Sequence, residues 1–430
     1  MYNLVSLTGI FILVLIAWGL SVDRKAVRWK TVLSGVLIQI AFAFLVFRFP
    51  PGRTVMLHLN GLVVAVLESA SAGSEFLFGR LALPPGATNA SGEQSLGFIL
   101  AFQALPTVVF FSSLMALLYY LGVLPRLIGL FARLFSRLMS ISGAESLCTA
   151  GNIFVGVESV TAVRPYLMRM TNSELCTVLA AGMSTIASSV LAFYVFILKG
   201  QFPSIAGHLI SASVLSAPAA VVMSKLLVPE TSSPVTLGVD IEPQFEKDAS
   251  ATDSVIRGAN EGLKLLFGIT AMLIAFLGLM SLVDMLLAWL SAISGLESGV
   301  SLAGILKYIF YPFTLIVGVP SEDAMEVAKL IGQRLIVTEV KSYQDLASLL
   351  ASGGLHNPRS AFIAAYALCG FAHVASLAIF VGGYSALVPE RTADISSQGL
   401  RGLLAANLAC LMTAAVAGLF YSSGDMILAG

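Results

Sequence analysis

Apolar stretches separated by short polar or basic segments occupy most of this chain. A helix that crosses a bilayer takes about 20 consecutive, mostly apolar residues. Eight stretches meet this requirement, at about residues 4–20, 31–49, 98–121, 173–198, 205–227, 265–290, 360–387 and 399–421. The pattern therefore predicts an all-α polytopic membrane protein with eight transmembrane helices.

Four other segments are too polar or too interrupted to span the bilayer. Residues 53–80 mix apolar positions with Arg, His and Glu and predict an interfacial amphipathic helix, and residues 123–139 carry three arginines at helical spacing and predict another on the cytoplasmic surface. Residues 141–167 are apolar but broken by Gly, Glu and Thr, so we expect a re-entrant hairpin there. Residues 301–350 predict a further amphipathic helix followed by a second re-entrant hairpin.

Basic residues are concentrated in four connecting segments. These are the 23–30 loop, the 126–137 helix, the 225–264 region and the turn from Arg391 to Arg401. Because cytoplasmic segments carry an excess of Lys and Arg, eight spans with both termini outside place all four segments inside. The first hairpin then enters from inside and the second from outside. The order hairpin, broken helix, span therefore occurs twice with opposite orientation, which predicts an inverted repeat.

Two similar segments, one in each half of the chain, interrupt two of the predicted spans. Residues 182–188 read G-x-S-x-I-A-S, and residues 370–376 read G-x-A-x-V-A-S. A break in a membrane helix is tolerated only where the loosened backbone is buried in protein or lines a cavity. A matched pair of breaks is typical of secondary transporters built from repeats, whose binding site lies near the bilayer midplane.

Composition agrees with a membrane protein and argues against nucleic acid as a partner. Of 430 residues, 57% are hydrophobic and 11% charged, the mean hydropathy is +0.91 and the net charge is +0. A soluble domain carries about 25% charged residues, and a nucleic-acid-binding domain carries a basic patch. The sequence has no clustered metal-ligand pattern, phosphate loop or nucleophile–base spacing, so we predict neither an enzyme nor a cofactor. The cysteines have no C-x-x-C spacing and are expected to be small buried hydrophobes: Cys148, Cys176, Cys369 and Cys410.

Polar side chains within the apolar stretches are candidate functional groups, because a charge at membrane depth is costly. Glu158 lies in the first predicted hairpin and Glu339 in the second. Each could accept hydrogen bonds from substrate hydroxyls or amides, or pair with a nearby arginine. Asn152 and Thr185 carry oxygen atoms, which sodium prefers as ligands. The alternative for both is hydrogen bonding between helices.

His373 lies on the second break, with Phe371 and Ser376 on the same segment. A lone histidine at such a place is either a structural donor or a functional group. Phe371 could stack on a base or sugar ring or serve only in packing, and Ser376 offers a hydroxyl. An imidazole ionises near neutral pH, so His373 could make substrate affinity depend on pH.

Several short motifs together resemble the concentrative nucleoside transporters, in order and over essentially the whole chain. The resemblance implies a homotrimer in which a scaffold domain holds the trimer. It also implies a transport domain of two hairpins and two broken helices that moves like an elevator, coupled to sodium or, in some bacterial members, to protons. The motifs are Asn152-Ile153-Phe154-Val155, Arg164-Pro165-Tyr166-Leu167, Ser216-Ala217-Pro218, Val319-x-x-Glu322-Asp323, Leu330-Ile331-Gly332 and Ala367-Leu368-Cys369-Gly370-Phe371-Ala372.

On this resemblance the chain divides into four parts. Residues 1–122 would be scaffold spans 1–3 with an interfacial helix, and residues 123–228 the first repeat of the transport domain. Residues 229–298 would be a cytoplasmic linker and a scaffold span, and residues 299–430 the second repeat of the transport domain.

The resemblance also implies two sets of site residues. The sodium ligands would be the side chains of Asn152 and Thr185 and the carbonyls of Val155 and Ile186. In the substrate site, Glu158 would lie near the nucleobase and Glu339 would bind the ribose hydroxyls. The remaining substrate contacts would come from the broken helices: Val190, Phe371, His373 and Ser376.

The sequence departs from the family mainly at the substrate. The family's G-Q-T-E-A-P is Gly156-Val157-Glu158-Ser159-Val160 here, one residue shorter; its N-E-F-V-A-Y is Thr338-Glu339-Val340-Lys341-Ser342-Tyr343; its F-A-N is Phe371-Ala372-His373. Losing an amide that pairs with a base can reduce discrimination by several orders of magnitude. Lys341 could also pair with Glu339, or meet an anionic ligand.

These observations predict an integral protein of the cell (inner) membrane that imports nucleosides, or a nucleoside-like solute, coupled to a sodium gradient by an elevator mechanism. Two alternatives remain. One is a proton-coupled transporter of a modified nucleoside or another small polar solute. The other is a nucleoside receptor that kept the binding fold and does not transport.

Overall fold

Helices form the regular secondary structure throughout the described part of the chain. The structure, a computed structural model, describes residues 2–89, 92–241, 248–294 and 301–422. Within these residues, strand-like pairing is limited to isolated bridges such as that between Ser142 and Leu237. The predicted all-α class is confirmed there.

The first group of helices extends from the N-terminal part of the chain through the third predicted span. The helix after residue 49 begins with Pro50-Pro51, which its first turn tolerates because N–H groups there have no partner within the helix. The elements are α1 (Tyr2–Gly19), α2 (Trp29–Phe47), α3 (Pro50–Phe78), the 3₁₀ turn η1 (Gly79–Leu81), α4 (Leu100–Gln103) and α5 (Pro106–Tyr120).

The next group of helices contains the first break. Two of its helices begin with a capping box, in which a Ser or Thr side chain and a Glu three residues later satisfy the first amides: Ser142 with Glu145, and Thr171 with Glu174. The elements are α6 (Val123–Met139), α7 (Gly143–Asn152), the 3₁₀ helix η2 (Gly156–Val163), α8 (Arg164–Leu167), α9 (Asn172–Ser184), α10 (Ser188–Leu198) and α11 (Ile205–Leu227).

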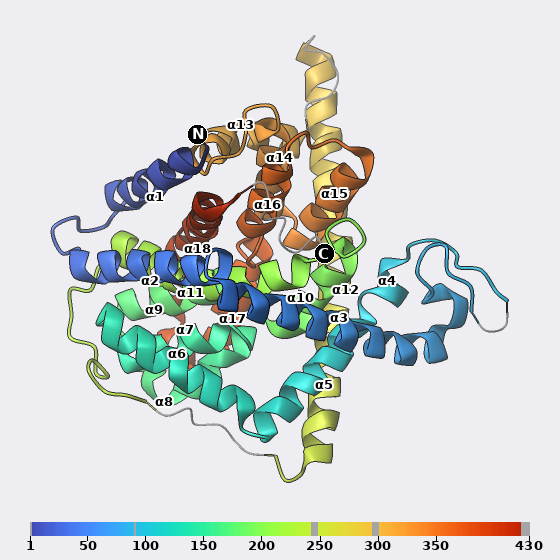
Figure 1. Ribbon diagram of the computed structural model, residues 1–430. Helices are drawn as coiled ribbons and strands as arrows, with labels where there is room; N and C mark the ends of the chain where they lie inside the picture. The colour runs from blue at the N-terminus through green and yellow to red at the C-terminus, as the bar shows by residue number, and fades with distance from the viewer. Residues whose placement is uncertain (1, 90–91, 242–247, 295–300, 423–430) are drawn as a thin grey trace.

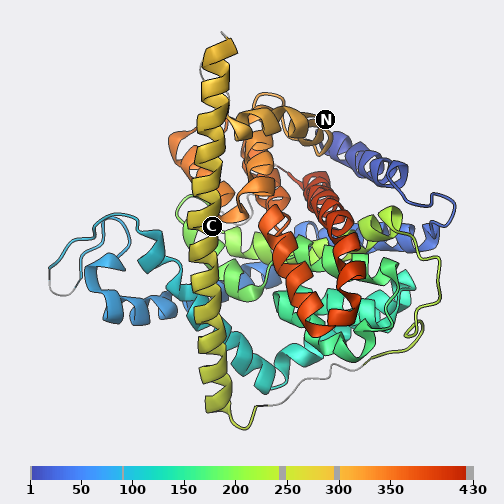
Figure 2. The ribbon, with the colours of Figure 1, turned by 180° about the vertical axis from the view of Figure 1, so that it is seen from behind.

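The longest described helix is α12 (Ala251–Ser294), with 44 residues. It extends past the other helices at both ends (Figures 1 and 2) and packs against α5. A Cβ atom at Gly258 or Gly262 would lie 2.7 Å from the α5 backbone. Glycines four residues apart thus let the two helices approach closely, as they do in membrane proteins generally.

The last group of helices contains the second break. Asp323 lies just before its second helix and accepts hydrogen bonds from the backbone amides of His356 and Asn357, both at 2.9 Å. These bonds tie the start of that helix to the loop before α16. The elements are α13 (Leu302–Ile316), α14 (Ala324–Ile336), α15 (Glu339–Ser352), α16 (Pro358–Ala367), α17 (Val374–Leu387), the 3₁₀ turn η3 (Pro389–Arg391) and α18 (Thr392–Phe420).

Eight helical segments of the described chain are long and apolar enough to cross a membrane, and seven correspond to predicted spans. The eighth is Pro50–Leu81, which we predicted to lie at the interface. Its length and composition also suit a span, so the interfacial position stays a prediction. The predicted span at 360–387 is divided between α16 and α17, and each of them is too short to span alone.

The same succession of elements occurs in both halves. A helix pair, a broken helix and a long helix appear as α7 to α11 and again as α14 to α18. In the second pair, α14 and α15 are joined by residues 337–338 alone. Helices α9, α11 and α18 form the core, and α11 is buried along almost its whole length. The core therefore lies beside both breaks and positions them.

Candidate functional site

The two helix breaks touch each other. Residues 185–187 separate α9 from α10, and residues 368–373 separate α16 from α17. Gly370 has φ +135°, and a Cβ atom there would lie 2.7 Å from the Ser184 carbonyl oxygen. Cys410 of α18 places its sulfur 3.0 Å from the Cys369 carbonyl and 3.9 Å from that of Ser184. Both breaks thus form one region.

His373 caps the N-terminus of α17. Its Nδ1 accepts the Ser376 backbone N–H at 3.1 Å, and the Ser376 hydroxyl accepts the His373 N–H at 3.2 Å. Because Nδ1 is the acceptor, the hydrogen-bond pattern assigns the ring proton to Nε2. The Ser376 hydroxyl also donates to the His373 carbonyl at 2.7 Å. The structure therefore engages Ser376 in the cap and directs His373 Nε2–H elsewhere.

The Nε2 atom of the His373 ring faces Glu339, the first residue of α15. Its side chain is 2% exposed, and its Oε2 lies 3.0 Å from His373 Nε2. The Tyr194 hydroxyl of α10 donates to Oε1. The structure thus brings together two predicted residues, Glu339 and His373, and adds a partner that we did not predict. Tyr194 follows Val190 by one helical turn, and that spacing was the available signal.

The carboxylate keeps capacity to accept further donors. Within the described residues, Glu339 Oε2 and the hydroxyl of Thr338 have no partner in full hydrogen-bond geometry, although both are buried. Lys341 pairs with Asp345 instead of Glu339, so the possible Lys341–Glu339 pair does not form. A buried acceptor without a donor is costly. Oε2 and the Thr338 hydroxyl are therefore suited to hydroxyl or amide groups of a ligand.

Tyr194 cannot easily leave the carboxylate. Its ring centroid lies 5.0 Å from that of Tyr343 on α15, and both side chains are fully buried. The Tyr343 hydroxyl donates to the Ala365 carbonyl of α16 at 2.9 Å. Two close-packed rings thus hold the Tyr194 hydroxyl on Oε1.

The predicted cation ligands lie beside the first break. Asn152 ends α7; its Nδ2 donates to the Cys148 carbonyl at 3.0 Å, and its buried Oδ1 has no donor among the described residues. The Ser213 hydroxyl of α11 lies 3.1 Å from the Ile153 carbonyl and 3.5 Å from that of Ile186. The Thr185 hydroxyl donates to a carbonyl one turn earlier, at 2.8 Å, and keeps its lone pairs free.

These contacts bring residues 152–155 beside residues 185–188. The Ser188 N–H donates to the Phe154 carbonyl at 3.0 Å, which joins the two segments directly. The candidate ligands are side-chain and carbonyl oxygens, the donor type that hard cations prefer. In the described residues, no group of three or more His, Cys, Asp and Glu side chains could hold a metal ion. The neutral side-chain and carbonyl oxygens beside the first break suit an alkali cation.

Three predicted substrate residues have weaker support. Glu158 lies in η2 with an exposed side chain, and within the described residues it forms no hydrogen bond or ion pair with Glu339. Val190 is buried within α10. The Phe371 ring is half-buried and stands edge-on to the His373 ring, with centroids 6.2 Å apart. Phe371 is thus next to the cluster formed by Glu339, His373 and Tyr194, which we call the Glu339 cluster. The role of Glu158 in substrate binding stays a prediction.

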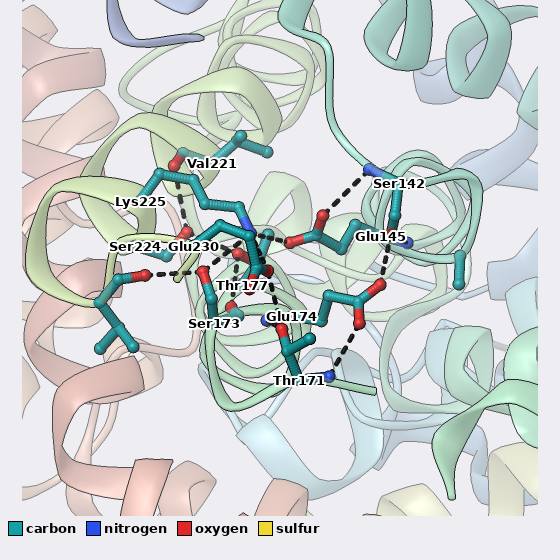
Figure 3. A network of polar contacts seen from close by, with 12 residues as sticks. Ser142, Glu145, Thr171, Ser173, Glu174, Thr177, Val221, Ser224, Lys225 and Glu230 are labelled. Carbon is teal, nitrogen blue, oxygen red and sulfur yellow. Dashed lines mark hydrogen bonds and ion pairs between the residues drawn. The ribbon is translucent and has the colours of Figure 1, made fainter. Parts of the chain in front are cut away.

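A second buried polar cluster ties the ends of α7, α9 and α11 together (Figure 3). Lys225 pairs with Glu145 and lies 3.7 Å from Glu230, while Glu174 accepts the Ser142 hydroxyl at 2.6 Å. A small solvent-open hollow lies beside it. Sequence reasoning missed this cluster, because its members come from segments far apart in the sequence.

Comparison with known proteins gives the family. Residues 208–418 match the family described as "Na+ dependent nucleoside transporter C-terminus", residues 8–81 its N-terminal counterpart, and residues 101–201 a family described as "Nucleoside recognition".

Curated relatives match along nearly the whole chain. The chain is 35% identical to the uncharacterized transporter YutK of Bacillus subtilis, covering 96% of this chain and 98% of that one. It is 33% identical to the nucleoside permease NupC of Helicobacter pylori, covering 97% and 98%. Identity to mouse solute carrier family 28 member 3 is 36%, over 97% of this chain and 59% of the relative. The chain thus spans about three fifths of the length of the mammalian relatives.

Solved structures agree with the sequence matches. CNTnw in an inward-facing substrate-bound state has a TM-score of 0.87 and 35% identity, with 98% of both chains covered. A CNTnw variant in an outward-facing state has a TM-score of 0.88 at 35% identity, also with 98% of both chains covered. These likenesses and the apolar helices make this an integral membrane protein. The full-length matches to sequences and structures together show that this chain belongs to the concentrative nucleoside transporter family.

Proposed function

We propose that this protein is a secondary transporter that imports nucleosides, or a nucleoside-like solute, coupled to a sodium gradient. The observation that carries the proposal is the buried Glu339 cluster, at the junction of α14 and α15 and in contact with the second break. It is supported by family membership and by a relative named as a nucleoside permease.

The proposed solute contact is a hydrogen bond from sugar hydroxyls to the Glu339 carboxylate. Oε2 and the Thr338 hydroxyl have capacity for further donors. Hydrogen bonds to a charged acceptor are stronger than neutral ones, so Glu339 supplies the largest part of the affinity. Phe371, adjacent to His373, offers an aromatic surface for the base or sugar ring. Glu158, Val190 and Ser376 complete the proposed substrate site.

The proposed sodium ligands are the side-chain oxygens of Asn152 and Thr185 and the carbonyls of Val155 and Ile186. Support comes from the buried Asn152 Oδ1 that lacks a donor and from the contact between the two segments. The first and second breaks touch at Ser184 and Gly370. The proposed ion and solute sites therefore adjoin each other at this contact.

We further propose the architecture that the family resemblance implies. Residues 1–122 and 229–298 supply the scaffold of a homotrimer, and residues 123–228 and 299–430 form the transport domain. The pairs α7–α8 and α14–α15 are re-entrant hairpins of an inverted repeat, and the transport domain moves as an elevator in the cell (inner) membrane. Both termini lie outside.

The alternative with a specific observation behind it is proton-coupled transport of a modified nucleoside or other small polar solute. His373 and Glu339 form a buried pair of ionisable groups, 3.0 Å apart, at the proposed solute site. A receptor that binds nucleoside without transport is the remaining alternative.

Uptake by proteoliposomes tests the proposal. Radiolabelled nucleosides and bases are presented with a sodium gradient, with a proton gradient in choline buffer, or with neither. We expect accumulation of at least one nucleoside only with the sodium gradient. A response to the proton gradient alone selects proton coupling. Equilibrium binding without uptake under any gradient selects the receptor, and no binding of any nucleoside refutes the substrate class.

A further inference from the structure

Arg334 of α14 is the largest fully buried side chain of the described protein. An arginine remains charged in proteins, so this is a permanent positive charge in the interior. Within the described residues, no carboxylate lies at ion-pair distance from it. A buried cation without a counter-ion is rare, and it requires another source of negative potential.

The negative potential comes from the second helix break. Arg334 Nη1 donates to the carbonyl of Ala367, the last residue of α16, at 2.6 Å. The C-terminus of a helix carries a partial negative charge and unpaired carbonyls, which a cation stabilises. Nη2 donates to the Asn407 Oδ1 of α18 at 2.5 Å. Asn407 in turn donates to the Ala372 carbonyl at 3.2 Å. The Arg334–Asn407 bridge thus holds both sides of the break.

Among the described residues, the first break has no such cation. The donors that reach its carbonyls within the described residues are neutral: the Thr185 and Ser213 hydroxyls and, more distantly, the Cys410 thiol. The end of α7 supplies Asn152, whose buried Oδ1 lacks a donor. The corresponding pair helix in the second half, α14, supplies Arg334 near its end instead. The first break therefore presents oxygen atoms to a cation, whereas the second break already contains a cation, the Arg334 guanidinium.

We propose that Arg334 is a tethered cation that holds the second break as a diffusible cation holds the first. It is a positioning residue: it keeps residues 368–373 in the conformation that presents Phe371 and His373 to Glu339. The second break is then ordered whether or not an ion is bound, and the second repeat takes no ion of its own. The comparison with the first break rests on the proposed sodium site, whereas the role of Arg334 rests on its own contacts.

The chain's cysteines provide a test that needs no nucleoside. Cys369 and Cys410 lie at the second break, and Cys148 lies beside the proposed sodium ligand Asn152; all are buried. The full-length protein is treated with a membrane-permeant alkylating reagent, and mass spectrometry reads each cysteine separately. Cys176, on α9, is the internal reference. In the unmutated protein we expect labelling of Cys369 and Cys410 to be slow and independent of sodium.

The decisive variants change the charge of Arg334. In Arg334→Gln and Arg334→Ala, labelling of Cys369 and Cys410 should be faster by about tenfold or more, the factor for losing one hydrogen bond to a charged group. In Arg334→Ala, low millimolar guanidinium chloride should slow labelling again, because a free cation can occupy the vacated position. Arg334→Lys should keep labelling close to the unmutated rate. Sodium-dependent labelling of Cys148 separately reports the proposed sodium site.

Arg359 supplies a matched control. Its buried guanidinium also donates to a backbone carbonyl, that of Gly318 at 2.8 Å, but at the start of α16. Arg359→Gln should leave Cys369 and Cys410 protected. The proposal is overturned if Arg334→Gln is labelled at the unmutated rate, if the Lys and Gln variants are equally fast, or if sodium changes Cys369 labelling in the unmutated protein. If neutral variants fail to fold, folding of Arg334→Lys supports the proposal and its failure overturns it.

Discussion

Replacement of Glu339 by Gln removes the charge at the centre of the proposed solute site while changing its volume little. In the structure, Oε1 accepts the Tyr194 hydroxyl and Oε2 lies 3.0 Å from His373 Nε2, which carries the ring proton. A carboxylate can accept from both sides. A carboxamide must turn its NH₂ group toward one of the two donors, so one existing contact becomes a clash between donors.

The expected loss follows from these contacts. A hydrogen bond to a charged group contributes about 1.5–3 kcal/mol, so loss of the charge-assisted bonds to the solute should weaken binding by about 2 kcal/mol or more. That corresponds to at least about thirtyfold in Kd. Radioligand binding in detergent, at saturating sodium, measures the change. Size-exclusion chromatography tests whether assembly is unchanged.

Lys341 provides the control for this experiment. It is partly exposed and pairs with Asp345, one helical turn later. Lys341→Gln removes a charge two residues from Glu339 and should leave Kd nearly unchanged, since exposed ion pairs contribute little. Unmutated affinity in the Glu339→Gln variant would refute the assignment of Glu339 as the main solute contact. An equal loss in both variants would show that general charge, and not the buried carboxylate, sets affinity.

Three further substitutions test other parts of the structure. Thr185→Ala removes a candidate oxygen ligand and should raise the half-saturating sodium concentration for uptake several-fold; equal values would exclude Thr185 as a ligand. His373→Asn should keep transport and favour ordinary nucleosides; an unchanged substrate ranking would make His373 structural. Burial raises the pKa of Asp323, but the hydrogen bonds from His356 and Asn357 outweigh it and hold that pKa below its usual range. The stabilising effect of the Asp323 carboxylate is thus present above about pH 4 and lost as pH falls through the lowered pKa. Asp323→Asn should therefore lower the melting temperature at pH 7. A difference in melting temperature between variant and unmutated protein that persists unchanged into acid would contradict this.

Hydropathy and the paired motifs predicted much of the fold, because a bilayer imposes length and apolar composition on each span. The helix end at 184 lies within the first small-residue segment that the sequence singled out, and the break at 368–373 overlaps the second. The segment Pro50–Leu81 shows the limit of such reasoning. Its residues suit either an interfacial helix or a span, and composition alone does not decide between them.

At the site, sequence reasoning identified Glu339 and His373 as candidate residues but not their geometry. Pairing within one helix follows from spacing, as for Lys341 with Asp345. Pairing between helices depends on how they pack, so neither the Tyr194–Glu339 hydrogen bond nor the Arg334–Asn407 bridge could be predicted from residue type. The three residues that were missed, Tyr194, Arg334 and Asn407, look like ordinary helix residues in the sequence. Only burial makes them exceptional.

The contact between Gly370 and Ser184 bears on how faithfully ion flux follows solute flux. A side chain at position 370 would meet the Ser184 carbonyl at 2.7 Å, and Cys410 lies against both breaks. In the proposed transporter, the ion half and the solute half of the site are then one rigid piece and change exposure in the same movement. Leak of ions without solute would require the two backbones to part. Slippage should therefore be small, and it should increase when Gly370 is replaced by alanine.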